Sequence, residues 1–328
     1  MSYRSLPKVE LHLHLEGAAP PSFIAGLARE KSIDIDRIFD SQGGFVRGDF
    51  EWFLKAYDAA CTVLQSPEDF RRLTLAVLEQ SAAQGVVYTE FFLSPDFCGG
   101  GDLAAWRDYL DAMVDASDEA ERSFGIASRG IVTCLRHLGP EAAKPIARCA
   151  AETKGRFITG FGLAGAEMMY RPGDFTWAYD AAREAGLQLT AHAGEWGGPD
   201  MVRDTVDLLG CERIGHGINA VSDHALCDHL IERGVTLEVC PVSNLVLGAV
   251  KDWKSHPIEE LRHRGLRVTV STDDPPWFGT TMTHEYEMLD RHFGWEEERL
   301  RLSNRVAAEA AFCDDDTRAQ ILKKLEAA

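Results

Sequence analysis

The chain has 328 residues, of which 45% are hydrophobic, and its 52 acidic and 34 basic side chains give a formal net charge of -18. This negative charge repels phosphate backbones and anionic lipid surfaces, so nucleic-acid and membrane partners are not expected. Met1 to Lys8 lack the apolar stretch of a signal peptide, and no later apolar run approaches the roughly 20 residues that span a bilayer. We therefore expect a cytoplasmic protein that forms one domain over residues 1–328.

Short runs rich in β-branched or aromatic residues predict eight strands. In chain order they are Val9–Glu16, Val86–Leu93, Gly125–Leu135, Ile158–Ala164, Leu187–His192, Arg213–His216, Val235–Val239 and Arg267–Thr272. Apolar residues three and four apart, as in amphipathic helices, occur in Phe50–Gln84, Leu103–Arg122, Phe175–Ala185 and Ser222–Arg233. This alternation favours an α/β fold, a (β/α)8 TIM barrel, over an open doubly wound sheet with a miscounted strand.

A helical insertion, Gly17 to Gly85, follows the first predicted strand. Aromatic residues gather near its centre, at Phe45, Phe50, Trp52, Phe53 and Tyr57. They are expected either to form a lid over a site or to cover the mouth of the barrel as part of the core.

The eight cysteines lie far apart, without a CxxC pair. We interpret them as reduced thiols of the core. The cytidine-deaminase type of zinc site needs a PCxxC segment, whereas here Cys240 precedes Pro241. That type of fold is therefore excluded.

Polar residues occur where predicted strands end, on the face of a TIM barrel that carries active sites. His12 and His14 are two residues apart on the first strand, so both rings point to one side and can bind one metal ion. Taken alone, the pair is more typical of two core or surface histidines. His192, at the end of the fifth strand, adds a third imidazole, and Glu195 just beyond it can move protons between water and a substrate.

Two further clusters follow the sixth and eighth predicted strands. His216 stands between two glycines and is a candidate electrostatic partner for a metal-bound water, or else a turn histidine held by backbone hydrogen bonds. Asp273 and Asp274 precede a proline. If the pair is buried, a cation can satisfy one carboxylate and a hydrogen-bond donor of the substrate the other. If the pair is solvated, the two aspartates cap the next helix.

The segment Gly160–Glu167 offers bare backbone amides and a carboxylate at another strand end. The HExxH motif of zincin proteases is absent from the sequence.

The order of these motifs resembles the adenosine deaminase family of the amidohydrolase superfamily. The resemblance is carried by LPKVELHLHLEG at residues 6–17, HAGE at 192–195, GHG at 215–217 and STDDP at 271–275. It spans essentially the whole chain. HxH is common to many amidohydrolases, whereas HAGE with a following GHG and TDDP is specific to the purine-deaminase branch.

The resemblance implies a hydrolase with one Zn²⁺ per chain that deaminates a 6-aminopurine. The metal ligands that it implies are His12, His14, His192 and Asp273. One position on the metal is left for water, whose pKa falls to near neutrality. In the family, the residue matching Glu195 protonates the purine ring and the match to His216 orients the attacking hydroxide. The matches to Asp274 and Gly165 contact the purine, the latter through its backbone.

The substrate expected first is adenosine or 2′-deoxyadenosine, with adenine and 6-aminodeoxyfutalosine as alternatives. Members of the family that act on adenosine commonly have aspartate where Glu16 and Ala166 stand. Glu16 is therefore predicted to bind substrate, either by reaching a ribose hydroxyl or by occupying the space that a ribose needs. The oligomeric state is not predicted.

Two other classes of function remain as remote alternatives. An amidohydrolase that cleaves an amide, ester or cyclic imide is weakened, because many such enzymes use a carboxylated lysine on the fourth strand and Ile158–Ala164 contains no lysine. A silent purine-binding barrel predicts loss of a metal ligand or of the acid, and none is lost.

Overall fold

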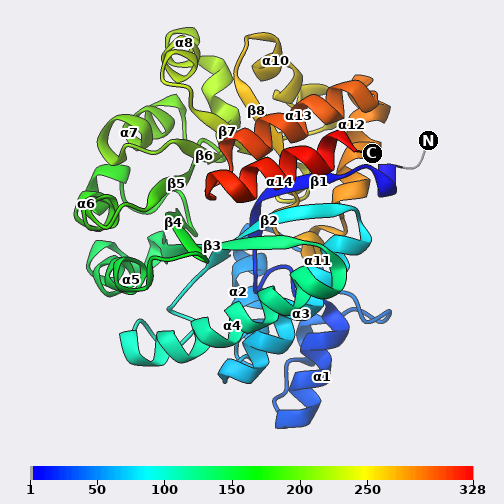
Figure 1. Cartoon of the computed structure of the whole chain (residues 1–328), viewed down its shortest axis with the longest axis vertical. Coiled ribbons are helices and arrows are strands. Elements are labelled where there is room, and N and C mark those ends of the chain that lie inside the picture. The colour runs from blue at the N-terminus through cyan, green and yellow to red at the C-terminus, as the bar shows by residue number, and fades with distance from the viewer. Residues whose placement is uncertain (1–2, 328) are drawn as a thin grey trace.

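The computed structural model of the chain describes residues 3–327, in which eight strands form a parallel sheet. Each strand pairs with the next in chain order, and the helices surround them (Figure 1). The strands are β1 (Lys8–His14), β2 (Val86–Leu93), β3 (Ala127–Leu135), β4 (Ile158–Ala164), β5 (Gln188–Ala193), β6 (Arg213–His216), β7 (Thr236–Val239) and β8 (Arg267–Val270).

The last strand returns to the first just beyond the end of β8. Leu13 forms a parallel bridge with Asp273, where the Asp273 N–H donates to the His12 carbonyl and the His14 N–H donates to the Asp273 carbonyl, both at 3.1 Å. This contact joins the two edges of the sheet and confirms the predicted (β/α)8 TIM barrel. It also carries Asp273 to the two histidines of β1.

The helices of the described residues are α1 (Pro21–Lys31), α2 (Phe50–Cys61), α3 (Pro67–Ala83), α4 (Leu103–Phe124), α5 (Pro140–Thr153), α6 (Thr176–Glu184), α7 (Pro199–Leu209), α8 (His224–Glu232), α9 (Pro241–Val246), α10 (Ile258–His263), α11 (Pro275–Phe278), α12 (Met282–Phe293), α13 (Glu297–Ala310) and α14 (Asp315–Glu326). None of them has the length and apolar character of a membrane span. Short 3-10 helices lie at Tyr3–Ser5, Asp36–Ile38, Arg136–Leu138, Pro172–Phe175, Ile218–Ser222 and Trp253–Ser255.

The insertion after β1 contains α1, α2 and α3. The stretch Phe50–Gln84, predicted to have the spacing of amphipathic helices, forms two helices, because α2 ends at Cys61 and α3 begins at Pro67. Ser66 caps α3 by accepting a hydrogen bond from the Asp69 N–H, and Pro67 fits the first helical turn, where no N–H is needed. Because of the break, α2 and α3 do not share one helix axis, and α2 lies across the barrel mouth.

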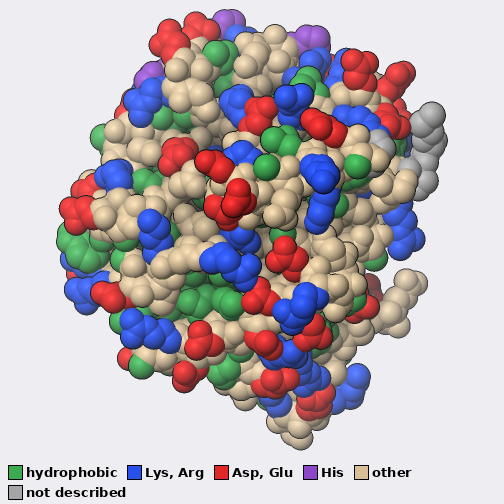
Figure 2. Space-filling view, in the orientation of Figure 1, with side chains coloured by type: hydrophobic (Ala, Val, Ile, Leu, Met, Phe, Trp, Pro, Cys, Tyr) green, Lys and Arg blue, Asp and Glu red, His purple; other side chains and the backbone are tan. Residues whose placement is uncertain are grey.

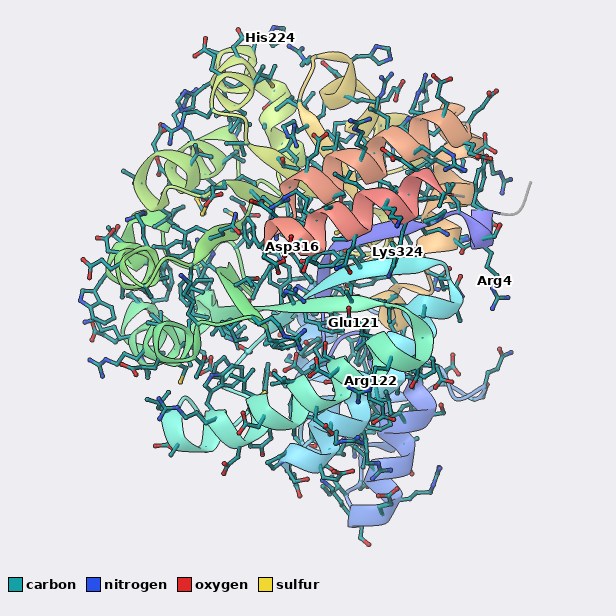
Figure 3. The ribbon with its side chains drawn as sticks, in the orientation of Figure 1. Arg4, Glu121, Arg122, His224, Asp316 and Lys324 are labelled. Carbon is teal, nitrogen blue, oxygen red and sulfur yellow. The ribbon has the colours of Figure 1, made fainter. Side chains whose placement is uncertain are left out.

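The C-terminal helices α13 and α14 pack side by side (Figure 1). α13 packs against β1 and β8, and α14 reaches β2. Lys324 of α14 donates to the Gly125 carbonyl at 2.7 Å, beside the end of α4 that Glu121 and Arg122 mark in Figure 3. The visible surface of these helices mixes acidic and basic side chains (Figure 2). Through these contacts, α13 and α14 cover the side of the barrel formed by β1, β2 and β8.

Candidate active site

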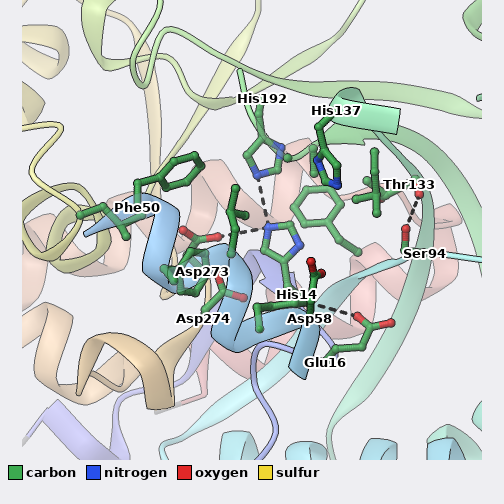
Figure 4. A pocket seen from close by; sticks show the side chains of 18 of the residues that line it. His14, Glu16, Phe50, Asp58, Ser94, Thr133, His137, His192, Asp273 and Asp274 are labelled. Atoms are coloured by element: carbon green, nitrogen blue, oxygen red, sulfur yellow. Dashed lines mark hydrogen bonds and ion pairs between the residues drawn. The ribbon is translucent and has the colours of Figure 1, made fainter. Parts of the chain in front are cut away.

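Four side chains that could bind a metal converge at the carboxyl ends of the strands. They are His12 and His14 of β1, His192 of β5 and Asp273 after β8, and their ligand atoms lie within 4.8 Å of one another. His14 Nε2 is 3.2 Å from both His192 Nε2 and Asp273 Oδ1 (Figure 4). His12 Nε2 is 3.4 Å from the same Asp273 oxygen. The structure thus brings together the four residues that the sequence suggested as ligands.

Neighbouring groups orient three of these side chains toward their common centre. His12 Nδ1 is 2.8 Å from Glu238 Oε2, and His192 Nδ1 is 3.0 Å from the Leu163 carbonyl. The Ser243 hydroxyl donates to Asp273 Oδ2 at 2.7 Å. A hydrogen on each Nδ1 leaves the Nε2 lone pair facing inward, and His12 Nε2 has no hydrogen-bond partner among the described residues. This donor set fits a divalent cation.

A buried network of charges lies behind His12. Glu238 Oε1 is 2.6 Å from Arg213 Nε, and Arg213 Nη2 is 2.6 Å from Glu90 Oε2. All three side chains are almost completely buried, so each charge needs its partner. Sequence reasoning missed this network. The signal was present, because Glu238 and Arg213 are charged residues within short strands that are otherwise apolar or neutral.

Glu195 and His216 face each other beside the four candidate ligands. His216 Nε2 is 3.7 Å from Glu195 Oε2, and Asn244 Nδ2 lies 3.1 Å from His216 Nδ1. If the Asn244 amide donates to Nδ1, the ring hydrogen is on Nε2, toward Glu195. Burial, followed by the charge of Asp273, raises the pKa of Glu195 well above its usual value. A carboxyl group with a raised pKa is suited to act as an acid.

Two site residues adopt a left-handed backbone that non-glycine residues rarely adopt. His216 has φ 60° and Asp273 has φ 67°. Such conformations cost about 1–3 kcal/mol each and persist where the surrounding structure fixes them. Here they turn the two side chains into the barrel mouth at the ends of their strands.

Asp274 and Glu16 are buried carboxylates that line the same pocket. Asp274 Oδ1 and Glu16 Oε1 have no hydrogen-bond partner among the described residues. Burial raises the pKa of Glu16 to about 7, and burial together with Asp273 raises the pKa of Asp274. Gly17 makes room for Asp274, because a Cβ at residue 17 would lie 1.5 Å from Asp274 Oδ1. Both carboxyl groups are available to a ligand.

Gly165 and α2 form other walls of the pocket. Gly165 has φ 90°, and a Cβ there would lie 2.6 Å from His137 Nδ1, so the position requires glycine. Phe50, Phe53 and Tyr57 of α2 line the pocket. Phe45 is instead buried and stacks on Trp277 with a ring separation of 3.8 Å, as the core interpretation expects. No lysine or arginine is among the described residues that line the pocket.

The sequence and the fold match known purine deaminases. A family model described as "Adenosine deaminase" matches residues 7–328. An adenine deaminase of Chelativorans sp. (strain BNC1) is 42% identical over 321 residues, covering 98% of each chain. One from Rhizobium leguminosarum bv. trifolii is 43% identical, covering 98% of this chain and 99% of the relative.

Two solved structures share the fold and 30% of the sequence. The adenine deaminase of Arthrobacter aurescens has a TM-score of 0.88, with 98% of each chain covered. An amidohydrolase of Burkhoderia ambifaria with bound Zn has a TM-score of 0.87, with 99% of this chain and 94% of the other covered. These relatives support the adenine alternative and give no specific support to adenosine, the substrate expected first.

The chain belongs to the adenosine deaminase family of the amidohydrolase superfamily and is a hydrolytic deaminase that acts on C–N bonds of cyclic amidines.

Proposed function

We propose that this protein deaminates adenine to hypoxanthine and ammonia. The observation that carries the proposal is Glu16, a buried carboxylate with a free oxygen in the pocket. Free adenine carries an N–H on its five-membered ring, and this N–H is lost when a ribose is attached. Glu16 Oε1 accepts a hydrogen bond from that N–H, whereas Oε2 already faces the Tyr57 hydroxyl at 3.5 Å, so a nucleoside would take the N–H away from Oε1 and bring the sugar against it. The curated adenine deaminases at 42–43% identity support the same choice.

Zn²⁺ is the metal that we propose for the site, one per chain. His12, His14, His192 and Asp273 would hold it, since three imidazole nitrogens and one carboxylate suit zinc and leave a position open. The zinc in the Burkhoderia ambifaria relative supports this choice. When bound, the metal would act as a Lewis acid and lower the pKa of a water molecule, which makes that water a better nucleophile for carbon 6 of the purine.

Three side chains carry the proton transfers and the orientation of the reactants. Glu195, whose pKa is raised by burial, donates a proton to the ring nitrogen beside carbon 6 as the water oxygen adds there. His216, oriented by Asn244, hydrogen-bonds the attacking oxygen and stabilises its charge. One proton of the attacking water replaces the proton that Glu195 gave up, and the other passes to the amino group. Ammonia then leaves as the bond between carbon 6 and the amino nitrogen breaks, and the ring nitrogen keeps its proton, which gives the 6-oxo purine.

The remaining polar groups of the pocket recognise the base. Asp274 accepts from or donates to the imidazole side of the purine, and the Gly165 backbone contacts the pyrimidine edge. The aromatic residues of α2 cover the ring faces and exclude water. Acidic groups without a nearby lysine or arginine disfavour a phosphate, so we exclude purine nucleotides as substrates.

The test is a steady-state comparison of adenine, adenosine, 2′-deoxyadenosine and 6-aminodeoxyfutalosine with zinc-loaded protein, followed by ultraviolet absorbance. We expect kcat/KM for adenine to exceed that for each nucleoside on the order of 10⁴-fold, as for sites whose buried group loses its hydrogen-bond partner. Faster turnover of a nucleoside would overturn the assignment to adenine. No turnover of any of the four compounds would overturn purine deamination itself.

A further inference from the structure

Glu167 collects four hydrogen bonds from one short loop. Its Oε1 accepts from the Gly194 N–H at 2.5 Å, and its Oε2 accepts from the N–H groups of residues 195, 196 and 197 at 3.1, 2.7 and 3.1 Å. The side chain is buried, with 2% of its surface exposed. The loop is not a helix terminus, because α7 begins only at Pro199 and its N-cap is Gly198. One carboxylate therefore holds the backbone of all four residues 194–197.

Asn219 holds the same loop through its carbonyl groups. Its Nδ2 donates to the Glu195 carbonyl at 3.1 Å and to the Gly197 carbonyl at 2.9 Å, and its own N–H donates to the Gly194 carbonyl at 2.9 Å. The backbone of Glu195 is thus fixed through both its N–H and its C=O. A loop with this many satisfied polar groups has little freedom to move.

Two glycines make the arrangement possible. Gly194 has φ 74°, and a Cβ at Gly197 would lie 2.6 Å from Glu167 Oε1. Glu167 itself follows Gly165, which lines the pocket, by two residues. The same short segment therefore lines the purine site at Gly165 and holds the loop of Glu195 at Glu167.

We propose that Glu167 is a positioning residue that fixes the proton donor Glu195 relative to the purine ring. The inference rests on the proposed function, in which Glu195 protonates the ring. A glutamine at residue 167 would direct an amide NH2 group at backbone N–H donors, so at least one of the four hydrogen bonds would be replaced by a repulsive contact. Glu195 would then be displaced while the four candidate metal ligands keep their own contacts.

The test compares Glu167→Gln, Glu195→Gln and the double variant, with adenine as substrate and with zinc content measured in each. Misplacement of a catalytic group by about 1 Å can cost on the order of 100-fold in rate. We expect Glu167→Gln to lower kcat 10- to 100-fold with full zinc content and KM within about threefold. The double variant should be no slower than Glu195→Gln, because a displaced donor matters only while the donor is present.

Asp69→Asn is the matched control. Asp69 is also a buried carboxylate that accepts a backbone N–H, from Gln65 at 2.9 Å, but it lies in the first turn of α3, pairs with Lys31 and does not line the pocket. This variant should lower Tm and leave kcat unchanged. If Glu167→Gln does not fold, Glu167→Asp, which keeps the charge but shortens the side chain by one methylene so that it cannot reach all four N–H groups, should show a loss of kcat and the same non-additivity with Glu195→Gln.

Two results would overturn the inference. Unchanged kcat in Glu167→Gln would show that the four hydrogen bonds do not act on Glu195. A loss that multiplies with that of Glu195→Gln would show a structural effect unrelated to the donor. Both outcomes differ from failure of the proposed function, in which the wild-type protein would not convert adenine at all.

Discussion

Replacing Glu238 by glutamine tests whether the orientation of His12 sets the affinity of the metal site. Glu238 places Oε2 at 2.8 Å from His12 Nδ1 and Oε1 at 2.6 Å from Arg213 Nε. Glutamine has a single acceptor oxygen, so its NH2 group must face either the imidazole N–H or the guanidinium. Loss of such a partner behind a metal-binding histidine weakens metal binding about 10- to 100-fold, or about 1.4–2.7 kcal/mol.

The substitution also disturbs the buried charges. Arg213 keeps its ion pair with Glu90 but loses the charge of Glu238, which we expect to lower the free energy of unfolding of the metal-free protein by roughly 3 kcal/mol. The two effects are separable, because metal affinity is read from competition with a chelator and stability from urea unfolding without metal.

Thr190→Val is the control for this prediction. Thr190 donates its hydroxyl to Glu238 Oε1 at 3.2 Å, and its removal leaves the carboxylate and both charged partners in place. We expect the Kd for zinc of this variant to stay within about threefold of the wild type, as for loss of one neutral hydrogen bond. Wild-type zinc affinity in Glu238→Gln, with the loss of stability alone, would refute the role assigned to Glu238.

Three further predictions concern the pocket, the acid and the pH dependence of stability. Gly17→Ala places a Cβ against Asp274, so kcat/KM for adenine should fall at least about tenfold with zinc content unchanged; unaltered kinetics would refute the close fit. Glu195→Gln should retain zinc and lose about 10²- to 10⁴-fold in kcat, and full activity would overturn its role as the acid. Burial lowers the pKa of His256 from 6.5 to about 4, so the fold favours its neutral form; the stabilisation is complete above pH 6.5 and is lost as the pH falls toward 4. Between pH 7 and 5 the wild type should lose about 2 kcal/mol more than His256→Asn in urea unfolding, and equal losses would contradict the assignment.

The strands were predictable because each is a short apolar or β-branched run between turns. β2, β4 and β6 have the predicted bounds, whereas β1 and β8 end two residues earlier than predicted. At those ends the alternation of apolar and polar residues continues through Leu15 and Glu16, and Thr272 is β-branched, but the chain has already turned to place Glu16 and Asp273 in the pocket. The break between α2 and α3 was missed, although Ser66 and Pro67 are a typical start of a helix.

The candidate ligands were predictable because strand ends of a barrel converge. The groups that orient the site were not, because their contacts are tertiary: Glu238 of β7 reaches His12 of β1, and Ser243 and Asn244, which follow β7, reach Asp273 and His216 after the neighbouring strands. Glu167 was noticed as a carboxylate at a strand end, but its four hydrogen bonds depend on a loop 27 or more residues away. The organisation as one domain and the roles of the site residues stay predictions.

The most direct test of the account is the product formed from adenine by purified, zinc-loaded protein. We predict that hypoxanthine and ammonia appear in a 1:1 ratio, that removal of the metal by a chelator stops the reaction, and that added zinc restores it. Adenine that remains unchanged with a fully occupied metal site, or conversion that persists at the same rate after the metal is removed, would contradict the account.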